Sequence, residues 1–400
     1  MSMYDITIVG GGIIGLSIGW ALTRRHPKAR ILVLEKENRW GHHQTGHNSG
    51  EIHSGIYYHP GSLKARFSRE GNEAMVKFCR DFGIPHEVCG KLIVATEAKE
   101  LGSLERLYAR GLVNGIEVRK LSADEIKEIE PFCAGLAGLQ VPSTGIVDYR
   151  HVAQTFADLI QKRDGELRLN TEVKEIKMLS SGLQIESSSA SFHSRFLINC
   201  AGLQCDRVAQ LMGIPTGMQI VPIRGEYYSL RAEKRHLVKN IIYPLPNPHY
   251  PFLGVHLNRL MNGQIRAGPS AVISFNREGY DKNHFHLRDA TKLVTSRSFW
   301  AFGARNWREG SKEYLCSRSK TLLTRRLRKL VPQICSDDLE AKHAGIRAQA
   351  LMHNGQLMDD FVILQGPHSI HICNAPSPAA TGAISIGNAV VDRIQQQGLL

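Results

Sequence analysis

The chain has 400 residues, of which 42% are hydrophobic, and a formal net charge of +13 at pH 7. This length is too great for one small core and suits two interwoven domains of an ordinary soluble globular protein. The positive charge favours an anionic substrate, a phosphate-bearing cofactor, an anionic membrane or nucleic acid as a partner, without choosing among them.

The eight cysteines are scattered, with no CxxC pair and no zinc-ligand spacing. This pattern predicts no metal site and a reducing compartment. No signal-peptide or transit-peptide pattern precedes the first apolar run. The longest apolar stretch, Ile6 to Leu22, contains five glycines and indicates strand, turn and helix rather than a membrane span. We therefore expect a cytoplasmic protein, whose membrane contact would be peripheral, on the inner face of the cytoplasmic membrane.

The first 35 residues predict a βαβ unit. Ile6 to Val9 is a short apolar run typical of a buried parallel strand, and a helix should run from about Ile14 to Arg25, where Pro27 stops it. Ile31 to Leu34 provides the second buried strand. The fold class is therefore α/β, with a Rossmann-like domain at the N-terminus.

A glycine-rich turn with the spacing GxGxxG joins the first strand to the helix. The first glycine permits the tight turn, the second lets a pyrophosphate approach the backbone, and the third lets the helix pack on the strand. An acid ends the second strand, where it can accept hydrogen bonds from ribose hydroxyls. We assign the following residues of this unit to a dinucleotide: Gly10, Gly12, Ile14, Gly15, Glu35 and Lys36.

Two further segments resemble pieces of the same domain, namely a buried strand ending in Asn199-Cys200-Ala201-Gly202 and the tail from Ile370 to Ile394. Between them, Val221 to Leu230 and Ile241 to Ala267 alternate and are broken by prolines, which predicts a mixed or antiparallel sheet. We expect a discontinuous FAD-binding domain over 1–80, 145–215 and 336–400, interleaved with an α+β substrate domain over 81–144 and 216–335.

Several blocks of sequence resemble one protein family over essentially the whole chain. They include Gln44-Thr45-Gly46-His47-Asn48-Ser49-Gly50, Thr144-Gly145-Ile146-Val147-Asp148-Tyr149-Arg150, Gly345-Ile346-Arg347-Ala348-Gln349-Ala350 and Asn374-Ala375-Pro376-Ser377-Pro378-Ala379-Ala380-Thr381. These blocks are similar to those of the L-2-hydroxyglutarate dehydrogenase/oxidase family, within the D-amino-acid-oxidase and glycerol-3-phosphate-dehydrogenase superfamily of flavoproteins.

The resemblance implies noncovalent FAD as the cofactor. It also implies further FAD contacts at Gln44, Thr45, His47, Asn48, Ser49, Val173, Ala201, Gly202, Pro378, Ala379, Ala380 and Thr381. The helix that follows the last of these loops would direct its positive end toward the flavin. No second GxGxxG unit is visible, so a small substrate rather than NAD should donate the electrons.

Oxidation of a 2-hydroxy acid requires a base for the hydroxyl proton and donors for the carboxylates. Histidine suits the first task, and His256 and then His53 are our candidates. Tyr57 and Tyr58 could bind a substrate carboxylate. Arg347 is the preferred carboxylate clamp, because a guanidinium binds a carboxylate through two hydrogen bonds, and Arg224 is the second candidate.

The chain departs from the family at two places. Glu51 stands where the family carries an apolar residue, and its carboxylate either faces solvent or faces inward, where it would repel a dicarboxylate. Arg266 also replaces an apolar family residue, and we expect it to point outward from a strand.

The sequence therefore predicts oxidation of L-2-hydroxyglutarate to 2-oxoglutarate, with a membrane quinone or oxygen as the final acceptor. The alternatives are oxidation of another small α-hydroxy or α-amino acid, or, more remotely, a flavin-dependent tRNA-modifying or nucleic-acid-binding protein. No RNA-binding module is visible, so we expect no nucleic-acid partner.

A basic segment from Arg318 to Val331 offers two interpretations. Leu323, Leu327 and Leu330 share one helical face among six cations, which suits an anionic bilayer. The same leucines could instead pack on the second domain, leaving the cations merely solvated.

Overall fold

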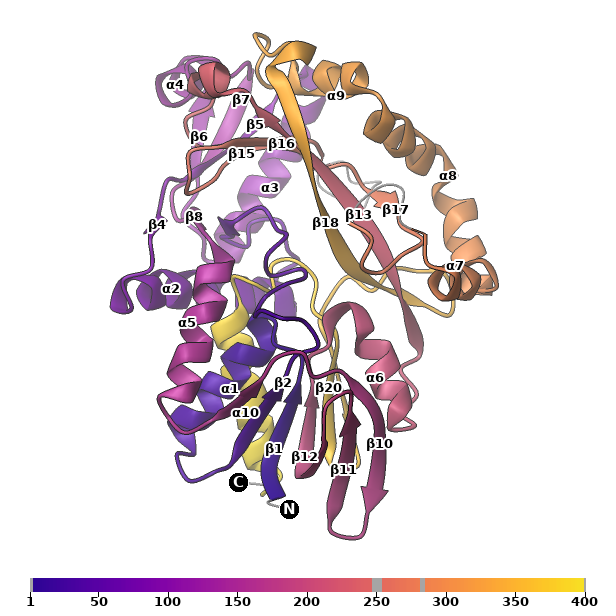
Figure 1. Ribbon diagram of the computed structural model, residues 1–400. Coiled ribbons are helices and arrows are strands. Elements are labelled where there is room, and N and C mark those ends of the chain that lie inside the picture. The colour runs from indigo at the N-terminus through magenta and orange to yellow at the C-terminus, as the bar shows by residue number, and fades with distance from the viewer. Residues whose placement is uncertain (1–2, 247–253, 281–284, 399–400) are drawn as a thin grey trace.

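The computed structural model describes residues 3–246, 254–280 and 285–398 and divides into two large sheets with helices around them (Figure 1). Part of the block expected to be antiparallel, 247–253, lies outside the described residues. Between the two large sheets lies a small antiparallel sheet made of β3 (Glu51–Ile52), β8 (Gly145–Val147) and β4 (His86–Glu87).

The first large sheet has eight strands, and its centre is the predicted βαβ unit. β1 pairs in parallel with both β2 and β12, while β20 extends the sheet in parallel beyond the C-terminal half of β12. The strands are β1 (Met3–Val9), β2 (Ile31–Leu34), β9 (Glu166–Arg168), β10 (Val173–Leu179), β11 (Gly182–Ser187), β12 (Ser191–Asn199), β19 (Val362–Gly366) and β20 (Ser369–Asn374).

Helices cover one face of this sheet, where α1 packs between α5 and α10 (Figure 1). These elements are α1 (Ile13–Arg25), α5 (Tyr149–Gln161), α10 (Ala383–Gln396) and, against α10, α2 (Leu63–Asp81). α1 ends at Arg25, before Pro27, as the sequence predicted. The Rossmann-like fold predicted from the sequence is confirmed.

The second large sheet has nine strands and is mostly antiparallel, with one parallel pair between β14 and β5. Its longest ladder joins β13 to β18, a strand that the sequence had grouped with the FAD-binding part. The strands are β5 (Lys91–Ala95), β6 (Arg119–Ser122), β7 (Ala137–Val141), β13 (Met218–Leu230), β14 (Ile241–Pro244), β15 (His256–Arg259), β16 (Ile265–Gly268), β17 (Val272–Ile273) and β18 (Leu339–Met352).

Five helices surround the second sheet, and a few 3₁₀ turns and one further helix complete the chain (Figure 1). The five are α3 (Leu101–Val113), α4 (Ala123–Ile129), α7 (Leu287–Val294), α8 (Arg297–Arg318) and α9 (Lys320–Leu327). The other pieces are α6 (Cys205–Leu211), η1 (Ala98–Glu100), η2 (Gly202–Gln204), η3 (Ala232–Leu237) and η4 (Ser336–Asp338).

The leucines of the basic segment face the protein interior. Leu323, Leu327 and Leu330 are at most 3% exposed and pack in a core cluster of the second sheet. Burial of these side chains leaves this helix without an apolar face for a bilayer, so the membrane interpretation of the segment is wrong and the packing interpretation is confirmed. Within the described ranges, no helix has the length and apolar character needed to cross a bilayer.

Candidate functional site

A cavity of about 1110 Å³ lies between the two large sheets. One wall comes from the carboxyl ends of β1, β2 and β12 and the loops that follow them, and the other comes from β13, β14, β15 and β18. Ligands of open parallel sheets bind at these carboxyl ends. The volume exceeds the usual range for a single small ligand, about 300–1,000 Å³, and so suits a dinucleotide together with a small substrate.

The glycine-rich turn closes one end of the cavity, and its three glycines have different tasks. Gly10 has φ +113°, and a Cβ on it would lie 2.4 Å from the carbonyl oxygen of Cys200. A Cβ on Gly15 would lie 2.0 Å from the carbonyl oxygen of Gly10. Gly12 differs, because its Cβ would meet only Thr45 Oγ1, at 3.5 Å, and would otherwise point into open space beside the cavity. That space is the cradle a pyrophosphate requires.

Side chains hold this turn in place. Glu35 accepts hydrogen bonds from the amides of Gly11 and Glu37, at 2.7 and 2.9 Å. Thr45 Oγ1 accepts the amide of Ile13 at 3.0 Å, at the N-terminus of α1. Each carboxylate oxygen of Glu35 keeps a second lone pair, which ribose hydroxyls could use.

Most of the residues assigned to the cofactor from the sequence line this cavity. They are Gly10, Gly12, Ile14, Glu35, Lys36, Gln44, Thr45, His47, Asn48, Ser49, Val173, Ala201, Gly202, Pro378, Ala379 and Ala380. Two assigned residues do not line it: Gly15 serves helix packing, and Thr381 is buried behind the wall. Thr381 Oγ1 accepts the amide of His53 at 3.0 Å and lies 2.9 Å from the Tyr149 hydroxyl, so it supports the loop that carries His53.

Glu51 faces inward, and its side chain is fully buried. Its Oε1 lies 2.7 Å from Lys91 Nζ and 3.1 Å from His53 Nδ1, and its Oε2 accepts the Tyr243 hydroxyl at 2.7 Å. Burial alone would raise the pKa of this carboxyl group, but the neighbouring His53 and Lys91 lower the pKa well below its ordinary value. The carboxylate is therefore ionised and its charge is compensated, so the inward orientation is the correct alternative.

Tyr57 and Tyr58 both line the cavity. The buried hydroxyl of Tyr57 has no hydrogen-bond partner among the described residues. Burial raises the pKa of this phenol well above its ordinary value, so the hydroxyl keeps its proton and can donate a hydrogen bond to a ligand. Tyr58 contacts Ser377 through its hydroxyl, and Lys64 Nζ lies 5.4 Å from the centre of its ring.

His256 lies in the wall opposite the flavin loops and stacks on Tyr243, with ring centroids 3.8 Å apart. Its Nδ1 lies 2.8 Å from the Gly254 carbonyl oxygen, so this nitrogen carries the proton. Burial lowers the pKa of His256 to about 3, and its Nε2 has no partner among the described residues. His256 is thus a neutral hydrogen-bond acceptor for a ligand and a weak base.

The three arginines singled out in the sequence occupy different environments. Arg347, in β18, lines the cavity and hydrogen-bonds the Tyr227 side chain. Arg224 is buried, pairs with Glu226 at 3.2 Å and does not line the cavity. Arg266 does not point outward as expected, because its Nη1 donates to the Asn48 carbonyl oxygen at 2.9 Å and burial lowers its pKa.

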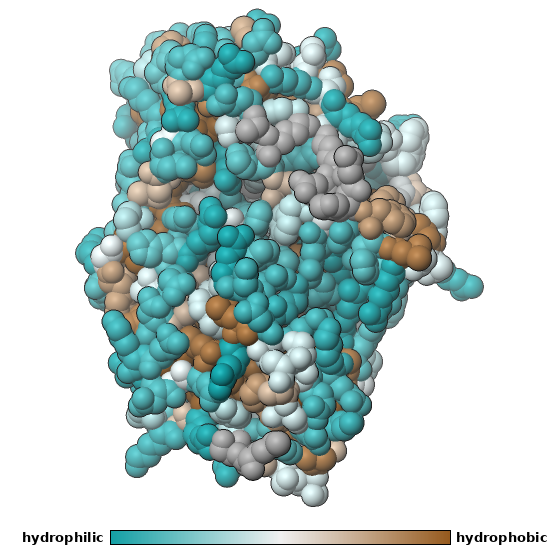
Figure 2. Space-filling view, viewed as in Figure 1, coloured by the Kyte–Doolittle hydropathy of each residue, from teal (hydrophilic) through white to brown (hydrophobic). Residues whose placement is uncertain are grey.

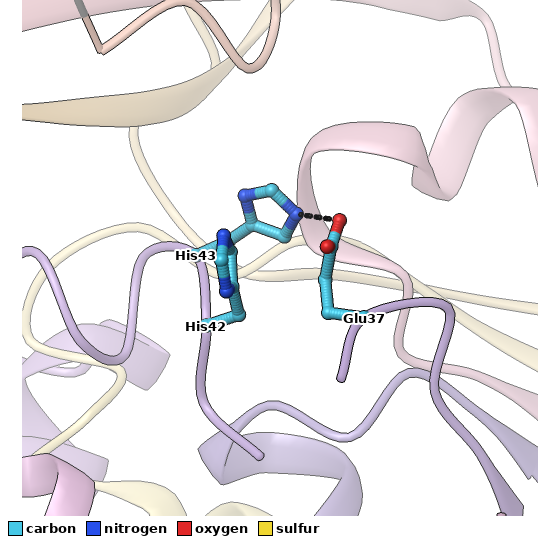
Figure 3. Close-up of side chains that lie close together, drawn as sticks. All are labelled: Glu37, His42 and His43. Carbon is cyan, nitrogen blue, oxygen red and sulfur yellow. Dashed lines mark hydrogen bonds and ion pairs between the residues drawn. The ribbon is translucent and has the colours of Figure 1, made fainter. Parts of the chain in front are cut away.

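Glu37, His42 and His43 lie close enough together to suggest a metal site (Figure 3). Figure 3 shows the ring of His43 directed at the Glu37 carboxylate. However, Lys36 also pairs with this carboxylate, and Arg39 donates to Nδ1 of His42 at 3.0 Å. Two cations at the cluster disfavour a divalent metal ion. We therefore interpret these contacts as ones that hold the loop after β2 in place.

Two residues that sequence reasoning missed, Lys91 and Tyr243, complete the Glu51 cluster. Lys91 is 2% exposed, and its Nζ lies 4.8 and 4.9 Å from the ring centres of Tyr57 and Tyr243. The available signal was a lysine at the head of the apolar run Lys91–Ala95, a position that requires a charged partner when the strand is buried.

Comparison with known proteins agrees with this geometry. The family model described as FAD dependent oxidoreductase matches residues 5–393. The chain is 44% identical over 391 residues to L-2-hydroxyglutarate dehydrogenase of Indibacter alkaliphilus, covering 97% of this chain and 98% of that protein. It is 42% identical over 414 residues to the mitochondrial L-2-hydroxyglutarate dehydrogenase of Homo sapiens, covering 99% and 89%.

Among solved structures, the dithionite-reduced L-alpha-glycerophosphate oxidase from Mycoplasma pneumoniae with FAD bound has a TM-score of 0.81 to this chain. The match covers 99% of this chain and 95% of that one, at 22% sequence identity. At this level of identity, the likeness establishes the fold.

Gly12→Val should remove FAD without unfolding the chain. The protein leaves room for the added side chain, but that side chain would occupy the space that the pyrophosphate requires. Flavin absorbance per chain should fall at least tenfold while the circular dichroism spectrum stays unchanged. Gly102→Ala, in α3, is the control, since its Cβ would meet only Arg106 Nη1, at 3.7 Å. Full flavin content in the Gly12 variant would contradict the assignment of the cradle.

Proposed function

Because this chain belongs to the FAD dependent oxidoreductase family and, within it, to the L-2-hydroxyglutarate dehydrogenases, we propose that it oxidises L-2-hydroxyglutarate to 2-oxoglutarate. FAD is the cofactor. The observation that carries the proposal is one cavity that joins the glycine cradle to His53, His256, Tyr57 and Arg347. These side chains supply what a 2-hydroxy acid requires, namely a base, hydrogen-bond donors and a cation.

Arg347 and Tyr57 bind the carboxylates of the substrate. A guanidinium can bind one carboxylate through two parallel hydrogen bonds, and the unpartnered Tyr57 hydroxyl can donate another. Arg224 is not part of this set, because it is paired behind the wall. These contacts orient the substrate so that the single C2–H bond of the L enantiomer faces the flavin-binding side of the cavity.

His53 is the base that takes the proton of the substrate hydroxyl. His256 suits this task less well, because burial lowers its pKa to about 3, so its Nε2 takes up a second proton only weakly. Its free Nε2 can still accept a hydrogen bond from the hydroxyl and orient it. FAD, when bound, supplies the acceptor for the hydride that leaves C2.

The L enantiomer of 2-hydroxyglutarate should bleach the flavin under anaerobic conditions, and the D enantiomer should not. With both carboxylates fixed, the single hydrogen on C2 faces the flavin in the L enantiomer, whereas in the D enantiomer the hydroxyl takes its place. Stopped-flow absorbance measures this directly, with L-lactate and L-amino acids as the competing substrate classes. Equal rates with both enantiomers, or faster reduction by another acid, would contradict the proposed substrate.

Arg347→Lys should raise KM for the substrate by about tenfold or more, since lysine keeps the charge but loses the second hydrogen bond, which is worth about 1.5–3 kcal/mol to a charged group. Steady-state kinetics gives the comparison. Arg325→Lys, an exposed position in α9, is the matched control. An unchanged KM in the Arg347 variant would mean that another group binds the carboxylate.

The electron acceptor in this proposal is a membrane quinone, with oxygen as the alternative, and the contact with the membrane involves α7 and α8. Trp300, Trp307 and Tyr314 recur every seven residues along one stripe of α8 and are 61, 61 and 46% exposed. Leu287, in α7, is 70% exposed, and Figure 2 shows hydrophobic surface at the edge of the molecule where these helices lie.

The charges around this stripe favour an anionic surface. The most exposed charged side chains from 287 to 318 are cations: Arg288, Lys292, Arg297, Arg305, Arg308, Lys312 and Arg318. One acid, Glu309, is 35% exposed at its side chain and pairs with Lys312. A second copy of the same face would be repelled by these cations. Exposed aromatic side chains among basic residues are typical of helices that lie on anionic lipid, where each cation contributes about 1 kcal/mol.

The double variant Trp300→Ser/Trp307→Ser should lose cosedimentation with vesicles that contain phosphatidylglycerol, whereas the unaltered protein should bind at low salt and less at high salt. Val113→Ser, an apolar position on α3 that is 71% exposed, should bind like the unaltered protein. If the unaltered protein stays in the supernatant at low salt, the membrane contact is wrong and oxygen becomes the better acceptor.

A further inference from the structure

A carboxylate that is buried beside a substrate cavity needs a physical explanation. Glu51 is 1% exposed and lines the same cavity as Tyr57 and His256. Removing an ionised carboxylate from water costs several kcal/mol even after relaxation. The cost is offset here by three partners: Lys91 Nζ, the Tyr243 hydroxyl and His53 Nδ1.

The backbone fixes the relation between Glu51 and His53. His53 directly follows the two-residue strand β3, and its Nδ1 lies 3.1 Å from Oε1 of Glu51. β3 pairs with β8 at Glu51, whose carbonyl oxygen accepts the Tyr149 hydroxyl at 2.9 Å. The amide of His53 donates to Thr381 Oγ1. These contacts hold the backbone of both residues in place.

The contacts also determine which nitrogen of His53 carries the proton. An ionised carboxylate only accepts hydrogen bonds, so Nδ1 of His53 is the protonated nitrogen that faces Glu51. The lone pair is then on Nε2, at the other side of the ring, 3.4 Å from the Ser377 hydroxyl in the predicted flavin loop. Nε2 is thus the atom that can accept a proton from a substrate in the cavity.

We infer that Glu51 is a positioning residue for the reaction: it holds His53 in the tautomer and orientation in which Nε2 receives the substrate hydroxyl proton. This inference rests on the proposed function. In the step, the hydroxyl O–H bond breaks, its proton passes to Nε2 and its electron pair forms the C2=O bond, while the C2–H bond breaks and its hydride would pass to FAD, which supplies the acceptor when bound. Glu51 stays ionised throughout and stabilises the imidazolium that forms.

Lys91 has a different task in the same cluster. Its Nζ contacts Glu51 and lies over the rings of Tyr57 and Tyr243, so its charge balances the carboxylate. With this cation compensated, recognition of the substrate carboxylates depends on Arg347 and Tyr57. A purely structural role for the Glu51–Lys91 pair would not require the contact with His53.

Glu51→Gln should lower the rate of anaerobic flavin reduction by L-2-hydroxyglutarate about 100-fold, the lower end of the usual contribution of a general base. FAD content and the substrate concentration at half-maximal rate should change less than about twofold. The solvent deuterium isotope effect on reduction should increase, because proton transfer becomes slower. Glu130→Gln is the matched control, since Glu130 is also buried but its carboxylate accepts the backbone amides of Lys239 and Asn240 rather than a histidine.

The tautomer is measured independently of catalysis. Protein labelled with ¹⁵N-histidine, compared with a His53→Gln variant for assignment, should show a protonated Nδ1 and an unprotonated Nε2 for His53, and this pattern should change in Glu51→Gln. If the single variant does not fold because Lys91 is left uncompensated, Glu51→Gln/Lys91→Met removes both charges and should show the same loss of rate.

An unchanged rate and an unchanged tautomer in the variant would overturn the inference, as would losses of FAD and substrate binding that parallel the loss of rate. Failure of the unaltered protein to be reduced by L-2-hydroxyglutarate would instead contradict the proposed function. In that case, the tautomer measurement still decides whether Glu51 positions His53.

Discussion

The structure depends on the close approach of backbone to backbone at the glycine-rich turn. A Cβ on Gly10 would lie within 2.4 Å of Cys200, and one on Gly15 within 2.0 Å of Gly10, so only glycine lets the first strand, α1 and the loop after β12 meet. This contact places the N-terminus of α1 and the end of β2 at one end of the cavity. Glu35 and Thr45 then hold the turn through its amides.

Between the sheets, the site contains a buried ion pair and two buried polar groups that have no hydrogen-bond partner among the described residues. Glu51 and Lys91 neutralise each other at 2.7 Å in full burial. By contrast, the Tyr57 hydroxyl and His256 Nε2 are buried without partners among the described residues. Each such group costs about 1–3 kcal/mol in the absence of a ligand. A substrate that satisfies them recovers this free energy, which favours a polar acid over an apolar molecule of the same size.

The two basic helices show why a repeating pattern alone does not identify a surface. Leu323, Leu327 and Leu330 repeat at helical spacing and are buried. Trp300 and Trp307 also repeat at helical spacing but are more than half exposed. Periodicity shows that a helix has an apolar face. Whether another element covers that face depends on how α8 and α9 dock against the second sheet.

The sequence by itself determined the βαβ unit, the glycine turn and the acid at the end of β2, because these features depend on neighbours close along the chain. It also identified, through the glycine motif and a resemblance to a family, many of the residues that line the cavity. The tertiary structure decided where Glu51, Arg224, Arg266 and β18 lie and what they contact. Glu51 meets Lys91 from 40 residues away and Tyr243 from 192 residues away. The direction of a polar side chain is set by the strand that pairs beside it and by the charges that offset its burial, and local sequence contains neither.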